Sequence, residues 1–174
     1  MKCKLCLEEK ELIKKSHILP SFIYNGLFDD KHRLVSLNIN DFNDKSYHQT
    51  GYHEGGILCA DCDNGILGGL ERYASNTIYA EESKNGVHRK YHSGQGEVLP
   101  VLRFSNLNYT KLKLFFLSLL WKSHISKLNF FSQIDLGSKY GEKIRKMILN
   151  QYAGKEDEFE VVLIKIETDG TRPN

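Results

Sequence analysis

The residues best suited to chemistry are four cysteines in two Cys-x-x-Cys turns. Cys3 and Cys6 form the first turn, and Cys59 and Cys62 form the second. Each such turn places two thiolates on one edge of a tetrahedron, which is the coordination that zinc prefers, so two turns complete one shell. We therefore predict one structural zinc site that joins two segments lying far apart in the sequence. With all four positions filled by thiolate, this metal has no open position for substrate.

A redox-active pair and buried free thiols are the two alternatives to a metal site at these cysteines. A redox protein has no use for a second Cys-x-x-Cys motif, and neither motif is flanked by the strand-helix-strand pattern of thioredoxin-like proteins. A thiol oxidoreductase would bind little zinc and would cycle rapidly between dithiol and disulfide. The amino terminus is charged where an export signal needs an apolar core, so we expect a cytoplasmic protein with reduced thiols.

Histidine and oxygen-bearing side chains adjoin both cysteine turns. His17 follows the first turn, and Asp63 and Asn64 come directly after the second. An imidazole with its ordinary pKa of roughly 6.5 can accept a proton near neutral pH. Carboxylate and amide oxygens suit a hard divalent cation such as Mg²⁺. Glu71 falls on nearly the same helix face two turns further on, and it is either a further oxygen ligand or a solvated surface residue.

Short elements are expected to position the histidine. Residues 12–19 should form a strand that ends at a proline, and residues 20–26 a short helix, because proline is tolerated at the first helical position. Residues 34–39 and 47–52 have strand character, and the polar residues between them, through Lys45, are expected to form a loop.

A helix over residues 60–73 is expected to carry the second cysteine turn and the oxygen-bearing side chains. Its apolar residues recur at helical spacing, which predicts a stripe that faces the protein interior. The expected stripe consists of Ile66, Leu70 and Tyr73.

A polar stretch after residue 80 separates two parts of the chain. Residues 1–80 hold the cysteines and the oxygen ligands, and residues 81–174 are expected to form an α+β extension that packs on them. The expected elements of the extension are a strand over 98–104, helices over 109–126 and 139–151, and a strand over 159–166. The side chains expected to lie on the inner faces of these helices are Phe115, Phe116, Trp121, Tyr140, Ile144, Met147 and Ile148.

The order of these motifs resembles the zinc-containing, four-cysteine branch of the HNH endonucleases, also called ββα-metal or His-Me finger nucleases. The resemblance rests on a Cys-x-x-Cys turn followed by residues 16–20 (SHILP), and then on residues 57–64 (ILCADCDN). It covers residues 1–80, and it implies an α+β fold in which a zinc-stapled ββα-metal module precedes a small helical and strand layer. Downstream segments resemble the tails of bacterial HNH-type proteins, some of which sit in anti-phage defence loci.

The resemblance also implies an activity and a role for each candidate residue. In this family a strand histidine activates water, and a divalent cation on the helix stabilises the phosphate and the leaving 3′ oxygen, so that DNA is hydrolysed. His17 matches the general base. Asp63 and Asn64 match the helix position that holds the catalytic Mg²⁺ or Mn²⁺, with Glu71 as a further candidate ligand.

The chain departs from the family pattern at two points. Many members have an acidic residue immediately before the histidine, where this chain has Ser16, and the His-x-x-Lys end of the helix motif is absent. Asp63 supplies the negative charge that Ser16 lacks. The alternative function is a non-catalytic zinc-ribbon module that binds nucleic acid or a protein partner.

Any DNA-binding surface must be local, because the net charge of the chain is only +2. Lys14 and Lys15 flank the candidate general base and are expected to contact DNA phosphates. Arg89 and Lys90 belong to the basic, aromatic stretch 88–92, which is either a phosphate-contacting segment or a solvated loop.

Two further histidines lie in the segment before the second cysteine turn. His48 and His53 precede the second cysteine turn, and each is either a turn residue or a further histidine of the site.

The 174 residues suffice for one domain, or for a small module with a second layer. The most apolar stretch, 114–121, is far shorter than the roughly 20 residues that a membrane span requires, so we expect no membrane contact.

Overall fold

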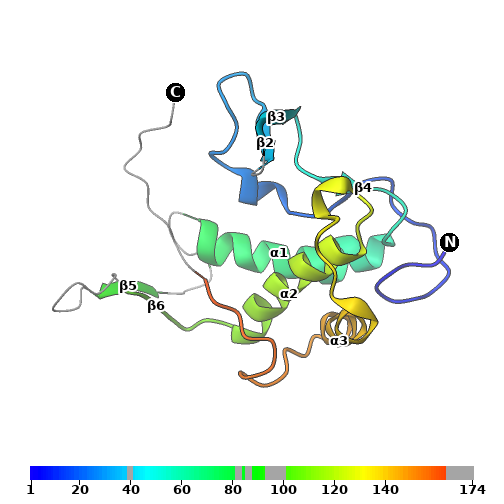
Figure 1. Cartoon of the computed structure of the whole chain (residues 1–174). Helices are drawn as coiled ribbons and strands as arrows, with labels where there is room; N and C mark the ends of the chain where they lie inside the picture. Colours follow the sequence, from blue (N-terminus) through cyan, green and yellow to red (C-terminus); the bar gives the residue numbers. More distant parts are fainter. Residues whose placement is uncertain (39–40, 81–83, 85–87, 93–100, 164–174) are drawn as a thin grey trace.

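Helices occupy the centre of the molecule and small sheets lie around them (Figure 1). The structure, a computed structural model of the chain, describes residues 1–38, 41–80, 84, 88–92 and 101–163, with backbone alone for 38, 42, 88–92 and 101–103. This mixture of helices and separate small sheets confirms the predicted α+β class. No helix in these ranges is both long and apolar enough to cross a membrane.

Three antiparallel sheets of two strands each are present in the described residues. In the first sheet, Ser16 lies opposite Glu54 and His17 lies opposite His53. The second sheet is a hairpin, and the third joins strands on either side of residues 93–100. The strands are β1 (Ser16–His17), β2 (Leu34–Asn38), β3 (Asp41–His48), β4 (His53–Glu54), β5 (His88–His92) and β6 (Val101–Ser105).

The prediction of a strand over residues 12–19 is wrong for most of this range, because only β1 within it forms a ladder. Residue 12 makes a single bridge to Cys59, and the N–H of Ile13 donates to the carbonyl of Leu58. Between these contacts and β1 the partner segment bends at Gly55 and Gly56, and Gly56 has φ of 74°, so no continuous ladder forms. The short helix expected over 20–26 is confirmed as a single 3-10 turn, η1 (Ser21–Tyr24).

The expected loop through Lys45 is also wrong, because residues 41–48 form β3 and pair with β2. This hairpin is largely exposed, and an antiparallel sheet can keep polar side chains in water on one face. The strand expected over 47–52 therefore ends early, at His48, and starts well before its expected position.

The predicted helix after the second cysteine turn is confirmed, and it extends to Tyr79. It consists of η2 (Asp61–Leu67), α1 (Gly68–Ala74) and η3 (Ser75–Tyr79), of which η2 and η3 have wide π turns. A π turn hydrogen-bonds residue i to residue i+5, which shifts the inward positions along the sequence. The buried residues are consequently Cys62, Leu67, Leu70, Ala74 and Thr77. Leu70 was expected, whereas Ile66 and Tyr73 are only half-buried.

Both C-terminal helices form close to their expected positions. They are α2 (Tyr109–Ile125) and α3 (Gly137–Leu149). Phe115 and Trp121 are buried as predicted, and Phe116 is partly buried against the same core. On α3 the residues Ile144, Met147 and Ile148 are buried, but Tyr140 is exposed, contrary to expectation.

One hydrophobic core joins the two parts of the chain. Leu5, Ile18 and Leu58 belong to the same buried cluster as side chains of α1, α2 and α3. The cysteine-bearing segments are therefore packed directly on α2 and α3.

The C-terminal strand expected over 159–166 is wrong for residues 159–163, which are irregular, with Val162 largely exposed. No strand pairs with them in the part of the chain that the structure describes, and an unpaired strand leaves its backbone groups unsatisfied. Residues 164–166 lie outside the described residues. The strand expected over 98–104 begins at Val101, and residues 98–100 also lie outside the described residues.

Candidate metal centre and adjoining histidine site

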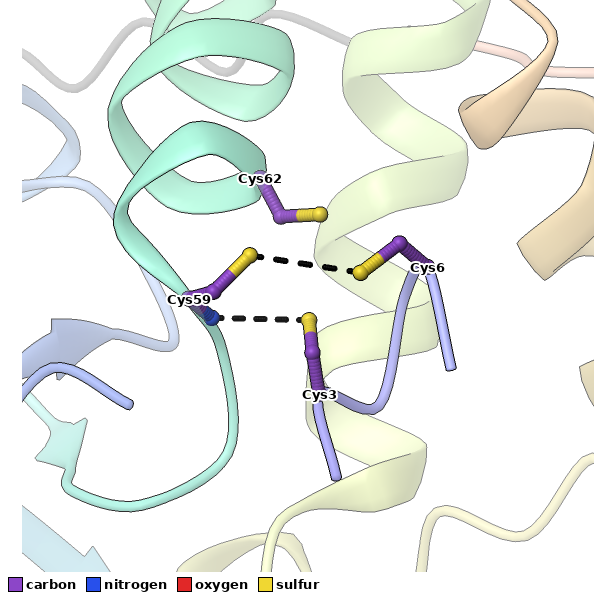
Figure 2. Close-up of side chains that lie close together, drawn as sticks. All are labelled: Cys3, Cys6, Cys59 and Cys62. Carbon is purple, nitrogen blue, oxygen red and sulfur yellow. Dashed lines mark hydrogen bonds between the residues drawn. The ribbon is translucent and has the colours of Figure 1, made fainter. Parts of the chain in front are cut away.

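The fold brings the four cysteine sulfurs into one cluster (Figure 2). All four Sγ atoms lie within 4.8 Å of one another, and no disulfide joins them. Zinc–sulfur bonds of about 2.3 Å give a tetrahedron with edges of about 3.8 Å, so a bound zinc needs the sulfurs to move by less than about 1 Å. The predicted gathering of Cys3, Cys6, Cys59 and Cys62 is thus confirmed, and the cluster could hold a metal ion such as zinc.

Backbone hydrogen bonds align the two cysteine turns. The N–H of Lys4 donates to the carbonyl of Ile57 at 2.9 Å, which ties the first turn to the segment before the second. Within the first turn, the N–H of Leu7 donates to the carbonyl of Cys3, and Leu7 adopts a left-handed conformation with φ of 64°. The second turn leads into the helical run that begins at Asp61, and the N–H of Asp63 donates to the carbonyl of Cys59 at 3.0 Å.

The thiols differ in how readily they ionise. Burial opposes ionisation of Cys3, but backbone N–H donors, including that of Cys59 at 3.4 Å, outweigh it and lower the pKa of Cys3 to about 7. Burial raises the pKa of Cys6 and of Cys62. Several thiolates close together need a compensating cation, which a divalent metal supplies.

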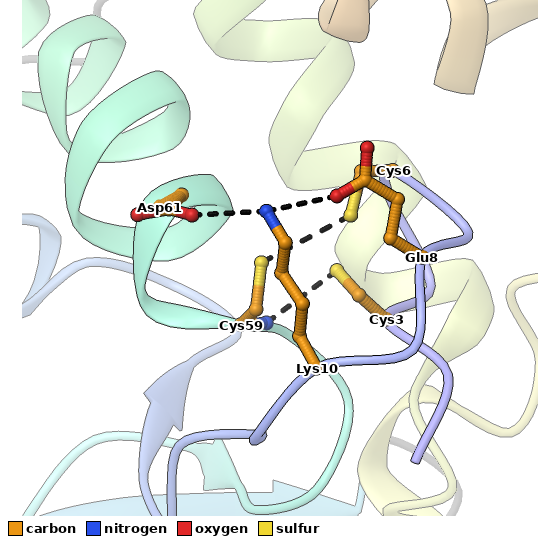
Figure 3. Close-up of polar contacts among 6 residues, drawn as sticks. All are labelled: Cys3, Cys6, Glu8, Lys10, Cys59 and Asp61. Carbon is orange, nitrogen blue, oxygen red and sulfur yellow. Dashed lines mark hydrogen bonds and ion pairs between the residues drawn. The ribbon is translucent and has the colours of Figure 1, made fainter.

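A lysine bridges the two segments on the outer side of the cluster (Figure 3). Nζ of Lys10 lies 2.8 Å from Oε2 of Glu8 and 3.1 Å from Oδ2 of Asp61. Hydrogen bonds to these two carboxylates raise the pKa of Lys10. Because exposed ion pairs contribute little stability, we interpret this bridge as orienting the first loop rather than as stabilising the fold.

A carboxylate of the helical run contacts the residue that precedes the candidate general base. The hydroxyl of Ser16, which is fully buried, donates to Oδ1 of Asp63 at 2.5 Å. Asp63 is half-buried, and Asn64 beside it is exposed. The negative charge absent from position 16 is therefore present at the same place, supplied by the helix.

His17 is held by its backbone and presents its side chain to solvent. Its carbonyl accepts a hydrogen bond from Nζ of Lys122 at 2.8 Å, and its imidazole is exposed. His53 on β4 is the strand partner of His17 on β1, and the centroids of the two imidazole rings are 6.1 Å apart. His17 and Glu71 line the same surface pocket, of about 280 Å³.

Glu71 is neither fully exposed nor unpaired. Its Oε1 accepts a hydrogen bond from Nζ of Lys122 at 2.7 Å, and 24% of its side chain is exposed. The side chain of Lys122 is only 1% exposed, and the other buried polar residues of α2 are Lys113, Ser118 and Ser123. The sequence analysis did not identify Lys122 as a site residue. A lysine on the inner face of an apolar helix could have indicated it, because a buried charge needs a partner.

The remaining candidates lie on several separate segments. Lys14 and Lys15 are exposed just before β1. Arg89 and Lys90 lie on β5, and their side chains are outside the described residues. His48 is half-buried on β3, with Nε2 3.1 Å from the hydroxyl of Ser46.

Among the described residues, the cysteines are the only group of three or more Cys, His, Asp or Glu side chains whose ligand atoms lie close enough to share one metal ion. A second, catalytic cation at Asp63, Asn64 and Glu71 therefore stays a prediction.

No protein-family model, curated protein or solved structure matches this chain. A function must therefore be argued from the chemistry of the site.

Proposed function

We propose that this chain is a metal-dependent endonuclease of the HNH type, which hydrolyses DNA phosphodiester bonds and carries a structural zinc ion on its four cysteines. The observation that carries this proposal is the 2.5 Å hydrogen bond between Ser16 and Asp63. It means that a carboxylate adjoins the strand residue before His17, the position at which many nucleases of this type carry an acidic residue. A carboxylate at this place is a candidate oxygen ligand for a divalent cation near the exposed histidine.

Each residue has a role that its surroundings support. The exposed imidazole of His17 takes a proton from the attacking water, while its backbone is held by Lys122. Asp63 and Asn64 offer oxygen atoms to a divalent ion. Such an ion, when bound, would stabilise negative charge on the phosphate and on the leaving 3′ oxygen. Glu71 contributes its second carboxylate oxygen, because the first already accepts from Lys122.

Zinc in the cysteine cluster serves structure rather than catalysis in this proposal. Four thiolates leave no coordination position for water or phosphate. The cluster ties the first loop to the start of the helix that carries Asp63, and the same loop leads directly into β1. The metal would thereby set the spacing between His17 and the helix.

One observation favours the alternative, a non-catalytic zinc module that binds nucleic acid or a protein partner. Asp63 already accepts a hydrogen bond from Ser16, and Glu71 already accepts one from Lys122. Carboxylates engaged in this way could serve the fold alone. The alternative predicts binding of DNA without cleavage.

Nicking of supercoiled plasmid in Mg²⁺ or Mn²⁺ tests the proposal. The wild type should nick, and His17→Asn should be at least about 100-fold slower, because an amide cannot accept the proton. His32→Asn is the matched control, since His32 is exposed and Asn tolerates its left-handed backbone with φ of 54°. A reaction with excess chelator reports contaminating nuclease. If wild type and His17→Asn bind DNA equally and neither nicks it, the alternative is correct.

A further inference from the structure

We propose that Arg72 binds a phosphate group of the DNA backbone in the pocket beside His17. This inference rests on the proposed function for the identity of the ligand, and it adds a residue that no motif indicated. Arg72 follows Glu71 on α1, and it lines the same pocket as His17, the candidate general base.

The pocket has the size and lining of a site for a small polar group. Its volume of about 280 Å³ is slightly below the range of about 300–1,000 Å³ that is usual for sites of larger ligands. Residues with hydrogen-bonding side chains line it from three segments, namely β1, η1 and the helical run α1–η3. These side chains are His17, Ser21, Glu71, Arg72, Ser75 and Asn76.

The charges of the pocket favour an anion. Its one carboxylate, Glu71, is paired with the buried Lys122 at 2.7 Å. Arg72 is exposed and has no acidic partner within the described ranges. The uncompensated charge at the pocket is therefore the guanidinium of Arg72, whose planar set of donors matches two oxygens of a phosphate.

The neighbouring groups complete a phosphate site. Ser21, Ser75 and Asn76 offer hydroxyl and amide donors, which commonly contact phosphate oxygens in protein–DNA complexes. A phosphate held there by Arg72 adjoins the exposed imidazole of His17, where a general base must act. The chain lacks a lysine at the end of its helix motif, and Arg72 supplies a cation on the same helical run.

The first experiment uses inorganic phosphate and needs neither DNA nor cleavage. Phosphate is titrated at constant ionic strength and pH, with chloride as reference, while the NMR signals of the His17 ring and the Arg72 side chain are followed. We expect saturable shifts in the wild type. Affinity should fall by roughly tenfold or more in Arg72→Gln and recover in part in Arg72→Lys. Lys139→Gln, at an exposed lysine of α3, is the charge-matched control and should bind like wild type. Absence of saturable shifts, or equal affinity of Arg72→Gln and wild type, overturns the inference.

The second experiment identifies the source of the phosphate. Binding of a short DNA duplex is measured without divalent cations over a range of salt concentrations. Loss of one backbone contact in Arg72→Gln should weaken binding roughly tenfold and lower the slope of log affinity against log salt by roughly 1. An unchanged slope would show that the pocket takes free phosphate and not the DNA backbone, which also overturns the proposal. If the wild type binds DNA but does not nick it, the proposed nuclease activity is refuted. The two binding measurements on Arg72 do not depend on cleavage, so they still test this inference.

Discussion

The ammonium group of Lys122 lies 2.7 Å from Oε1 of Glu71 and is almost completely shielded from water. It also donates to the carbonyl of His17 at 2.8 Å, so one side chain of α2 holds both α1 and β1. A buried ammonium is costly unless it is paired and hydrogen-bonded, and these two acceptors satisfy it. The position of the candidate general base therefore depends on a helix far along the chain.

Replacing Lys122 should destabilise the fold. Lys122→Met keeps the shape of the side chain but leaves Glu71 without its partner, so we expect a loss of about 1–3 kcal/mol in the free energy of unfolding. Urea denaturation followed by circular dichroism measures it. Lys127→Met, at an exposed lysine just after α2, should stay within about 0.5 kcal/mol of wild type.

The double variant Lys122→Met, Glu71→Gln measures how much of the lost stability comes from the contact between these two side chains. Removing both charges should cost less than the sum of the two single losses, because neither group is then left without its partner. Strict additivity, or a Lys122→Met protein with the urea midpoint of wild type, would contradict the role that we assign to this contact.

Removal of zinc should unfold the cysteine-bearing segments. We expect one zinc ion per chain in the purified protein, and a fall in the melting temperature of roughly 10 °C or more after chelation, because structural zinc contributes directly to folding. Cys62→Ser should bind zinc more weakly and melt at a lower temperature. Elemental analysis and thermal scans test this, and recovery after adding Zn²⁺ is the control. A zinc-free protein that melts like the untreated one would exclude a structural metal.

Asp63 should matter for nicking and not for folding. Asp63→Asn keeps a hydrogen-bond acceptor for Ser16 but removes the charge, so the nicking rate should fall on the order of 100-fold while the melting temperature changes little. Asp61→Asn is the matched control, because the Asp61 side chain is 79% exposed and forms an ion pair with Lys10. Equal nicking rates in the two variants would remove Asp63 from the site.

Acid should weaken the contact between α3 and the first cysteine turn. Hydrogen bonds from Arg145 lower the pKa of Glu142 from 4.5 to about 2, and Arg145 also donates to the carbonyl of Leu5 between Cys3 and Cys6. Because the pKa is lower in the folded state, the stabilisation is fully present above about pH 4.5 and is lost as the pH falls toward 2. Wild type should therefore exceed Glu142→Gln in stability at pH 6, and this advantage should vanish near pH 2.

The pH experiment compares the stability of wild type with that of each variant at the same pH. Loss of zinc in acid then affects all of the proteins alike and does not alter the comparison. Urea midpoints are measured at several pH values for wild type, Glu142→Gln and Glu156→Gln. Glu156 is exposed in the C-terminal irregular segment and serves as control. A stability gap between wild type and Glu142→Gln that does not change with pH would refute the linkage.

The local patterns of the sequence were sufficient for the cysteine cluster and for the helices. Cys-x-x-Cys fixes two sulfurs within one turn, so the repeated motif predicted the cluster before any fold was known. A long apolar run over 109–126 and hydrophobic periodicity over 139–151 placed α2 and α3 nearly at their true ends, because a helix satisfies its backbone within one segment.

Only the tertiary structure decided where strands end and which polar groups meet. Residues 12–15 and 159–163 have strand-like composition, yet they form no ladder, because a strand needs a partner that local sequence does not specify. The π turns of η2 moved burial from Ile66 to Leu67. The contacts of Lys122 and the pocket at Arg72 join segments remote in sequence, so packing alone brought these charges to His17.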